Sequence, residues 1–273
     1  MNPRTNEHKR VARWQLTAGM LSLLVASGCG RATGPTITVA GSTAFQPFAE
    51  KLAEQFMVER PDLNITIQGG GSALGIQAAL SGAAEIGMAD LVELPESAAA
   101  LSSVTVARDG IVIVVNPANG VAALTLDQVR AIFSGTIRNW REAGGADRPI
   151  RIVSREAGSG TRSSFEQIVG QVALPADAIV QDSNGTIRET VANDPDAVGY
   201  LSHGLLNGKV KALAVDGAAC TEADIASGAY TLVRPIFLLT RGEPAGASRD
   251  FLAYILSADG QETIRRNGLL PAR

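Results

Sequence analysis

Short β-branched runs alternate with stretches of helical periodicity along most of this 273-residue chain. Three strand-like runs are each followed by such a stretch: residues 37–40 then 47–59, 65–68 then 72–80, and 150–154 then 159–169. In the first helical stretch the apolar residues fall on one face, as expected of a helix that packs on a sheet. The alternation of strand and helix patterns predicts an α/β fold.

Two further runs, residues 110–116 and 235–240, are almost continuously apolar. Such runs are typical of strands that are buried on both faces. The length of the chain exceeds the commonest domain size, which favours two lobes over one. We expect the two runs to be crossings between a first lobe, residues 36–112 and 238–273, and a second lobe, residues 113–237.

The N-terminus has the order of a secretory signal. Four basic residues precede an uncharged stretch, residues 14–26, and Ser27-Gly28-Cys29 follows. This stretch is too short for a membrane-spanning helix, which needs about 20 residues. A lipoprotein signal peptidase recognises small residues before a cysteine and cleaves the chain directly before that cysteine. We expect residues 1–28 to be a lipoprotein signal peptide, Cys29 to be acylated, and residues 29–35 to form a tether; an ordinary signal peptide or a short anchor helix is the alternative.

Removal of residues 1–28 would change the net charge from −3 to about −6, because four basic residues and one Glu are lost. An acidic mature chain does not indicate a nucleic-acid partner. If Cys29 is acylated, Cys220 has no disulfide partner in the chain, so stability must come from hydrophobic cores. One binding cleft per chain is sufficient, and we expect a monomer.

The three predicted strand-to-helix junctions are rich in glycine and hydroxyl side chains: Gly41-Ser42-Thr43, Gly69-Gly70-Gly71-Ser72 and Gly158-Ser159-Gly160-Thr161. Glycine allows the backbone to approach a ligand. The first amides of a helix lack intrahelical partners and favour negative charge. In open α/β sheets ligands bind outside the carboxyl ends of the strands. The three junctions together predict a site for a small anion, although helix capping alone would explain any one of them.

Two charged residues follow predicted strands and extend this site. Arg155 offers a planar fork to a tetrahedral oxyanion. Asp90 can accept a hydrogen bond only from an anion that still carries a proton, as phosphate does at neutral pH and sulfate does not. A structural ion pair is the alternative for both residues, and a solvated helix position is the alternative for Arg162.

Other chemistries find less support. No junction has a complete dinucleotide or P-loop fingerprint, and no metal or other cofactor is indicated. A serine hydrolase would use Ser72 or Ser159, but neither lies in a Gly-x-Ser-x-Gly motif. His203 would be the only histidine left after loss of the signal peptide. We therefore do not expect an enzyme.

Taken together, the motifs resemble the phosphate-binding proteins of phosphate ABC importers, in the periplasmic-binding-protein-like superfamily. The matching segments follow one another along the chain: residues 41–47, 69–72, 86–90, 155–162, 126–140, 198–202 and 230–235. The resemblance implies a two-lobed type II periplasmic-binding-protein fold with two hinge crossings. It also implies export, and docking of the closed form on a transmembrane permease from the periplasmic or exterior face of the membrane.

By the same resemblance, a specific set of residues would hold phosphate: Thr43, Ala44, Ser72, Asp90, Arg155, Ser159, Gly160 and Thr161. Ser42, Arg162 and Asn184 are further candidates. Ala157 departs from the pattern, because some relatives carry an Asp there, close to the binding arginine. Another oxyanion, such as sulfate or molybdate, and a role as the ligand-sensing module of a membrane receptor remain alternatives.

Overall fold

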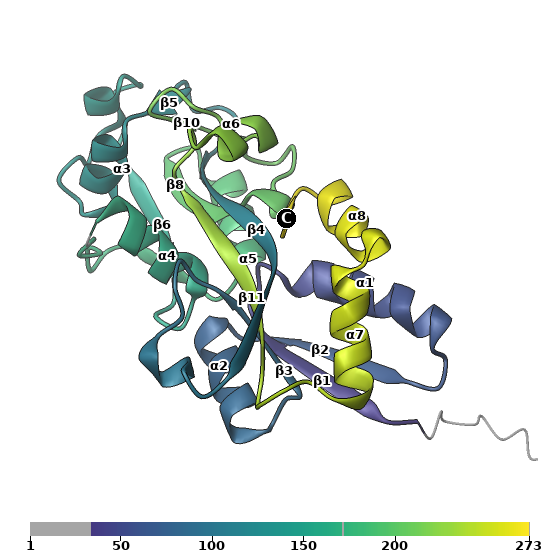
Figure 1. Cartoon of the computed structure of the whole chain (residues 1–273). Coiled ribbons are helices and arrows are strands. Elements are labelled where there is room, and N and C mark those ends of the chain that lie inside the picture. The colour runs from purple at the N-terminus through teal and green to yellow at the C-terminus, as the bar shows by residue number, and fades with distance from the viewer. Residues whose placement is uncertain (1–33, 171, 273) are drawn as a thin grey trace, which may run out of the picture. The chain divides into compact units, whose positions relative to one another are not determined.

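A mixed β-sheet is the central feature of the computed structural model, which describes residues 34–170 and 172–272 (Figure 1). Its longer strands are β1 (Thr36–Gly41), β2 (Asn64–Gly69), β3 (Ile86–Asp90), β4 (Ser102–Val115), β6 (Arg151–Arg155), β7 (Ile179–Gln181), β8 (Ala197–Ser202) and β11 (Val233–Thr240). Two-residue strands are β5 (Ala123–Leu124), β9 (Lys211–Ala212), β10 (Ala214–Val215) and β12 (Leu270–Pro271).

The strand order is β2-β1-β3-β11-β4-β8-β6-β7, with β12 and β9 paired to β4, and β5 with β10 forms a separate ribbon. β1 is parallel to β2 and β3, and β6 is parallel to β7 and β8. Between these two parallel groups, β11 and β4 are antiparallel to each other and to their outer neighbours. Each parallel group is therefore a separate α/β unit, and β4 and β11 connect the two.

Helices follow the strands as the sequence pattern predicts. They are α1 (Gln46–Glu59), α2 (Ser72–Ser81), α3 (Leu126–Phe133), α4 (Gly160–Val169), α5 (Asn184–Asn193), α6 (Glu222–Ser227), α7 (Gly246–Leu256) and α8 (Ala258–Arg266). Three short 3₁₀ helices are Glu96–Ala98, Trp140–Ala143 and His203–Leu205. The predicted helices at 47–59, 72–80 and 159–169 correspond to α1, α2 and α4, and α8 was not predicted.

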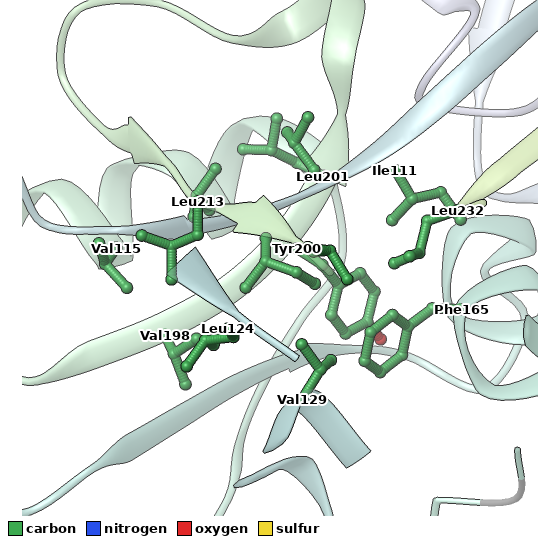
Figure 2. Packing of buried hydrophobic residues seen from close by; sticks show 14 of the residues in the cluster. Ile111, Val115, Leu124, Val129, Phe165, Val198, Tyr200, Leu201, Leu213 and Leu232 are labelled. Atoms are coloured by element: carbon green, nitrogen blue, oxygen red, sulfur yellow. The ribbon is translucent and has the colours of Figure 1, made fainter. Parts of the chain in front are cut away.

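Separate hydrophobic cores include the first and the second half of β4. One hydrophobic cluster contains Phe48, Phe56 and Phe251 together with Ala107 of β4 and Ile236 of β11. A second, larger cluster contains Ile111 to Val115 of β4, Phe133, Phe165, Tyr200 and Leu232 (Figure 2). β4 pairs with β11 through Gly110 and with β8 from Ile111 onward. Residues 110–115 of the apolar run are thus the buried second half of one 14-residue strand, and Asn116 lies just outside it.

The predicted α/β class and two-lobed fold are confirmed. The predictions for the signal peptide, Cys29 and most of the tether concern residues outside the described part of the chain. Within residues 34–170 and 172–272, no helix combines the length and the apolar character needed to cross a membrane.

Candidate anion-binding site

Two polar side chains from separate elements meet at Thr43, which lies in the junction between β1 and α1. Arg155, the last residue of β6, donates from Nη2 to Thr43 Oγ1 at 3.2 Å. Asn184, the first residue of α5, donates from Nδ2 to the same oxygen at 3.3 Å. Its Oδ1 accepts from the Ser202 amide at 3.0 Å. Thr43 belongs to the first α/β unit, and Arg155 and Asn184 belong to the second, so the contact lies between the two units.

The Arg155 guanidinium is buried, with 1% of the residue exposed. Its Nε donates to Glu156 Oε2 at 2.9 Å, and its Nη2 donates to Glu156 Oε1 at 2.8 Å. Nη2 also donates to the Asp182 carbonyl at 3.2 Å. Nη1 is buried and has no hydrogen-bond partner among the described residues. A buried charged donor without an acceptor is costly, so this nitrogen is suited to an anionic oxygen.

Asp90 is the last residue of β3 and is 2% exposed. Ser72, the first residue of α2, donates to its Oδ1 at 2.5 Å and accepts from its amide at 3.0 Å. Thr161, in the first turn of α4, donates to Oδ2 at 3.2 Å. Ser164 of α4 donates to the Asp90 carbonyl at 3.2 Å. The carboxylate therefore contacts hydroxyl groups from both α/β units.

The N-termini of α2 and α4 approach each other closely. The Ala73 amide donates to the Gly158 carbonyl at 3.2 Å. A Cβ at Gly160 would lie 2.1 Å from Ser72 Oγ and 2.7 Å from Asp90 Oδ1, so only glycine fits there. Gly71 precedes α2 with a φ of 88°, and a Cβ there would lie 2.7 Å from the Gly158 carbonyl oxygen. Both glycines allow the two helix ends to meet.

The capping alternative explains only part of this chemistry. The Ser159 hydroxyl caps α4, since it accepts from the Arg162 amide at 3.2 Å. α1 and α2 begin without a side-chain cap. The Ser42 hydroxyl accepts from the Ala44 and Phe45 amides, at 3.1 Å each, and so shapes the junction before α1.

Arg162 has other partners. Its Nε donates to Glu166 at 2.7 Å, and its Nη1 donates to the Arg155 carbonyl at 2.9 Å. It therefore supports the backbone of Arg155, and no described contact brings its guanidinium to Thr43 or Asp90.

A buried ion-pair chain adjoins Asp90; the sequence left an ion pair open for Asp90 but did not identify Arg234 and Asp109 as its members. Arg234 of β11 places Nη1 2.7 Å from Asp90 Oδ2 and Nη2 2.8 Å from Asp109 Oδ2. Ser202 donates to Asp109 Oδ1 at 2.8 Å. Burial raises the pKa of the Asp109 carboxyl, and the Arg234 guanidinium opposes that rise. The signal in the sequence was a charged residue directly before each of the two apolar runs, Asp109 before residues 110–116 and Arg234 before residues 235–240.

The two halves of the site differ in chemistry. Around Arg155 there are donors: the guanidinium, the Asn184 amide and the Thr43 hydroxyl. Around Asp90 there is an acceptor, together with hydroxyl groups that can rotate. An anion that accepts hydrogen bonds on most of its oxygens and donates one matches this division.

Comparisons with known proteins agree with this fold. Residues 27–259 match the family described as PBP superfamily domain. The chain belongs to this superfamily of binding proteins and, within it, to the family of the phosphate-binding protein PstS. It is 39% identical to the PstS of Bacillus subtilis over 243 residues, which cover 88% of this chain and 81% of that protein.

Solved structures that are similar to this chain also include phosphate-transport proteins. A Clostridium perfringens structure, described as a putative phosphate ABC transporter substrate-binding protein with bound phosphate, is 37% identical, with a TM-score of 0.85. The match covers 88% of this chain and 100% of that one. An ABC-type phosphate transport receptor from Vibrio cholerae is 35% identical, with a TM-score of 0.73, over 86% and 99% of the two chains. The predicted resemblance is thus confirmed.

Proposed function

We propose that this chain captures inorganic phosphate between its two lobes and delivers it to the transmembrane permease of an ABC importer. The unpartnered Nη1 of Arg155 carries the proposal, because a buried cationic donor at the boundary of two lobes needs an anionic acceptor. The names of the PstS relative and of the phosphate-bound neighbour support phosphate as that anion.

Phosphate would be held by groups on both sides of the boundary. Arg155 Nη1 and the Thr43 hydroxyl would bind its oxygens, and Asp90 would accept its remaining proton. Amides and hydroxyl groups at the three junctions would complete the shell, contributed by Ala44, Ser72, Ser159, Gly160 and Thr161. Asn184 would orient Thr43, and Ser42 would orient the Ala44 amide. Recognition is local, since the Debye length is about 8 Å at physiological salt and the chain is acidic overall.

The lobe division supports uptake by closure. The two lobes, residues 36–112 with 238–273 and residues 113–237, would separate about β4 and β11 to admit phosphate and close again on it. The contacts of Thr43 with Arg155 and Asn184, and of Asp90 with Thr161, would form on closure.

Export and anchoring complete the proposal. Residues 1–28 would direct export, and acylated Cys29 would anchor the protein to the membrane, facing the periplasm or exterior. The protein would act as a monomer and a carrier without catalysis. The Ser72 and Ser159 hydroxyl groups bond Asp90 and the Arg162 amide, whereas His203 Nδ1 bonds the Gly268 carbonyl.

Calorimetric titration tests the proposal directly. The chain from residue 30 onward, freed of ligand by unfolding and refolding, is titrated with phosphate and then with sulfate. We expect tight one-to-one binding of phosphate and no comparable binding of sulfate. Preference for sulfate, or binding of neither anion, would refute the assignment.

A further inference from the structure

Arg234 and Asp109 face each other on the two strands that connect the lobes. They are direct partners in the β11–β4 register. Arg234 Nε and Nη2 donate to Asp109 Oδ2 at 3.3 and 2.8 Å. Both residues are 0% exposed. The pair therefore lies where the chain crosses between lobes, next to the candidate site but outside its predicted residue set.

One guanidinium serves two carboxylates. Arg234 Nη1 lies 2.7 Å from Asp90 Oδ2 and donates to the Asp90 carbonyl at 3.4 Å. Both Asp109 oxygens have donors, Arg234 on Oδ2 and Ser202 on Oδ1. Asp109 can therefore hold Arg234 in one orientation. A buried charge that loses its partner is strongly destabilised, so Asp90 and Asp109 both depend on this cation.

The contact also determines which face of Asp90 is available. Arg234 approaches Oδ2 from β11, whereas Ser72 and Thr161 approach the two oxygens from the helix N-termini. These three contacts fix the orientation of the carboxylate. A carboxylate held in one orientation can accept a hydrogen bond from a proton-bearing oxygen of the ligand, whereas an anion without a proton offers it no donor.

We propose that Arg234, held in place by Asp109, is a positioning residue that fixes the orientation of the Asp90 carboxylate, and so sets the preference for phosphate over fully ionised oxyanions. This inference rests on the proposed function. It assigns a role in specificity to two residues of the connecting strands.

The alternative is that the Arg234–Asp109 ion pair has a structural role alone and only stabilises the pairing of β4 and β11. The two roles differ in one measurable respect. A positioning residue acts through Asp90, so its effect on selectivity should disappear once Asp90 is replaced by Asn. If the pair were purely structural, its loss would weaken the binding of phosphate and of sulfate by the same factor, whether or not Asp90 is present.

The experiment is a double-mutant cycle read by calorimetry with phosphate and with sulfate. Arg234→Met should weaken phosphate binding by about tenfold or more, the equivalent of about 1.4 kcal/mol. It should also reduce the ratio of phosphate affinity to sulfate affinity by a similar factor. In an Asp90→Asn background the same substitution should change the ratio by less than about threefold. Arg234→Lys should restore part of the ratio, since it keeps the charge but loses the fork.

Arg60 provides the matched control. It also bridges two aspartates, Asp62 and Asp250, but it does so on the surface of the first lobe, with 38% of its side chain exposed. Arg60→Met should leave both affinities unchanged. The melting temperature of each variant separates a loss of fold from a loss of selectivity.

The outcomes are distinct. If the wild-type chain binds no phosphate, the proposed function and this inference both fail. If the wild type binds phosphate but Arg234→Met has the same effect on the ratio in both backgrounds, the inference alone is overturned. Should Arg234→Met not fold, Asp109→Asn and Arg234→Lys carry the test: a narrowed ratio in both supports the proposal, and an unchanged ratio in both overturns it.

Discussion

Arg155 and Glu156 are adjacent in the sequence and form a two-point ion pair, Nε to Oε2 at 2.9 Å and Nη2 to Oε1 at 2.8 Å. Consecutive residues of a strand point to opposite faces, so such a pair requires a break in the strand. β6 ends at Arg155, and Glu156 is already outside it. The carboxylate occupies the edge of the guanidinium formed by Nε and Nη2 and leaves Nη1 for a ligand. Glu156 thus supplies the acidic partner that the resemblance places at position 157, where this chain has Ala157.

Replacement of Glu156 by Ala should weaken phosphate binding by about three- to tenfold, because Arg155 loses two charge-assisted hydrogen bonds that orient it. Glu156→Gln should lie closer to wild type, since its amide oxygen still accepts one bond. Calorimetry with phosphate measures both. Glu262→Ala, which breaks surface pairs with Arg265 and Arg266, is the matched control. Tighter binding by Glu156→Ala would show that repulsion of the anion outweighs positioning.

Removal of the Arg155 guanidinium should cost at least about 1.5 to 3 kcal/mol of phosphate binding, the range for a charge-assisted hydrogen bond. Arg155→Ala should nevertheless keep a melting temperature near that of the wild type without ligand, because the variant also loses the unpartnered Nη1. Titration and thermal unfolding are measured on the same preparation. Unchanged phosphate affinity would remove Arg155 from the site.

Substitution of Asp90 by Asn should narrow the preference for phosphate over sulfate, because an amide presents donors as well as an acceptor. The neutral side chain also no longer repels a fully ionised anion. The ratio of the two dissociation constants measures the effect, and an approach toward equal affinities is expected. A ratio equal to that of the wild type would mean that Asp90 does not accept a hydrogen bond from the protonated oxygen of the ligand.

Local patterns were sufficient to predict much of this molecule from its sequence. The alternation of strand and helix, the three glycine-rich junctions and the buried run that ends β4 all depend on neighbouring residues. Arg155 and Asp90 were identified because both end strands. Their roles in binding remain predictions.

Features that depend on distant partners were not predictable in the same way. Arg234 and Asp109 are 125 positions apart and meet only through strand pairing. The first half of β4, residues 102–109, carries polar and charged side chains that mask the strand pattern. α8 is largely polar, with Gly260 and Ile264 as its buried residues, and so has a weak apolar stripe.

Gly160 and Gly158 lie in one junction but should differ greatly in their tolerance of an added methyl group. A Cβ at Gly160 would meet Ser72 Oγ at 2.1 Å and the Asp90 carbonyl oxygen at 2.5 Å, so Gly160→Ala should prevent the α2 and α4 ends from meeting. At Gly158 the nearest contact would be Ala73 Cβ at 3.6 Å, an ordinary distance. We expect Gly160→Ala to weaken phosphate binding by about a hundredfold or more and Gly158→Ala by less than about threefold.

Small-angle scattering adds a second measurement for this pair. Phosphate should reduce the radius of gyration of the wild type and of Gly158→Ala, but not that of Gly160→Ala. Equal affinities of the two variants for phosphate would argue against the close approach of these helix ends in the bound state.

Tyr200 should make stability fall steeply at alkaline pH. Its ring stacks on the ring of Phe165 (Figure 2), and the two centroids are 4.2 Å apart. Its hydroxyl is 2.7 Å from Ser154 Oγ. Burial raises the pKa of Tyr200 to about 12, from an ordinary value near 10. The unfolded chain therefore loses this proton first. The stability that Tyr200 contributes is complete below about pH 10 and is lost as the pH rises toward 12, by up to roughly 3 kcal/mol.

Tyr200→Phe separates this titration from packing. The variant keeps the stacked ring but loses the hydrogen bond, so at pH 8 its free energy of unfolding should be about 1 kcal/mol lower than that of the wild type. Above pH 10 the difference should shrink and then reverse, because phenylalanine has no proton to lose. Urea unfolding followed by circular dichroism from pH 8 to 12, with Tyr254→Phe as the partly exposed control, measures the curves. Parallel curves for Tyr200→Phe and the wild type would show that the buried phenol is not the group that titrates, and would move attention to Tyr230, whose pKa is also raised by burial.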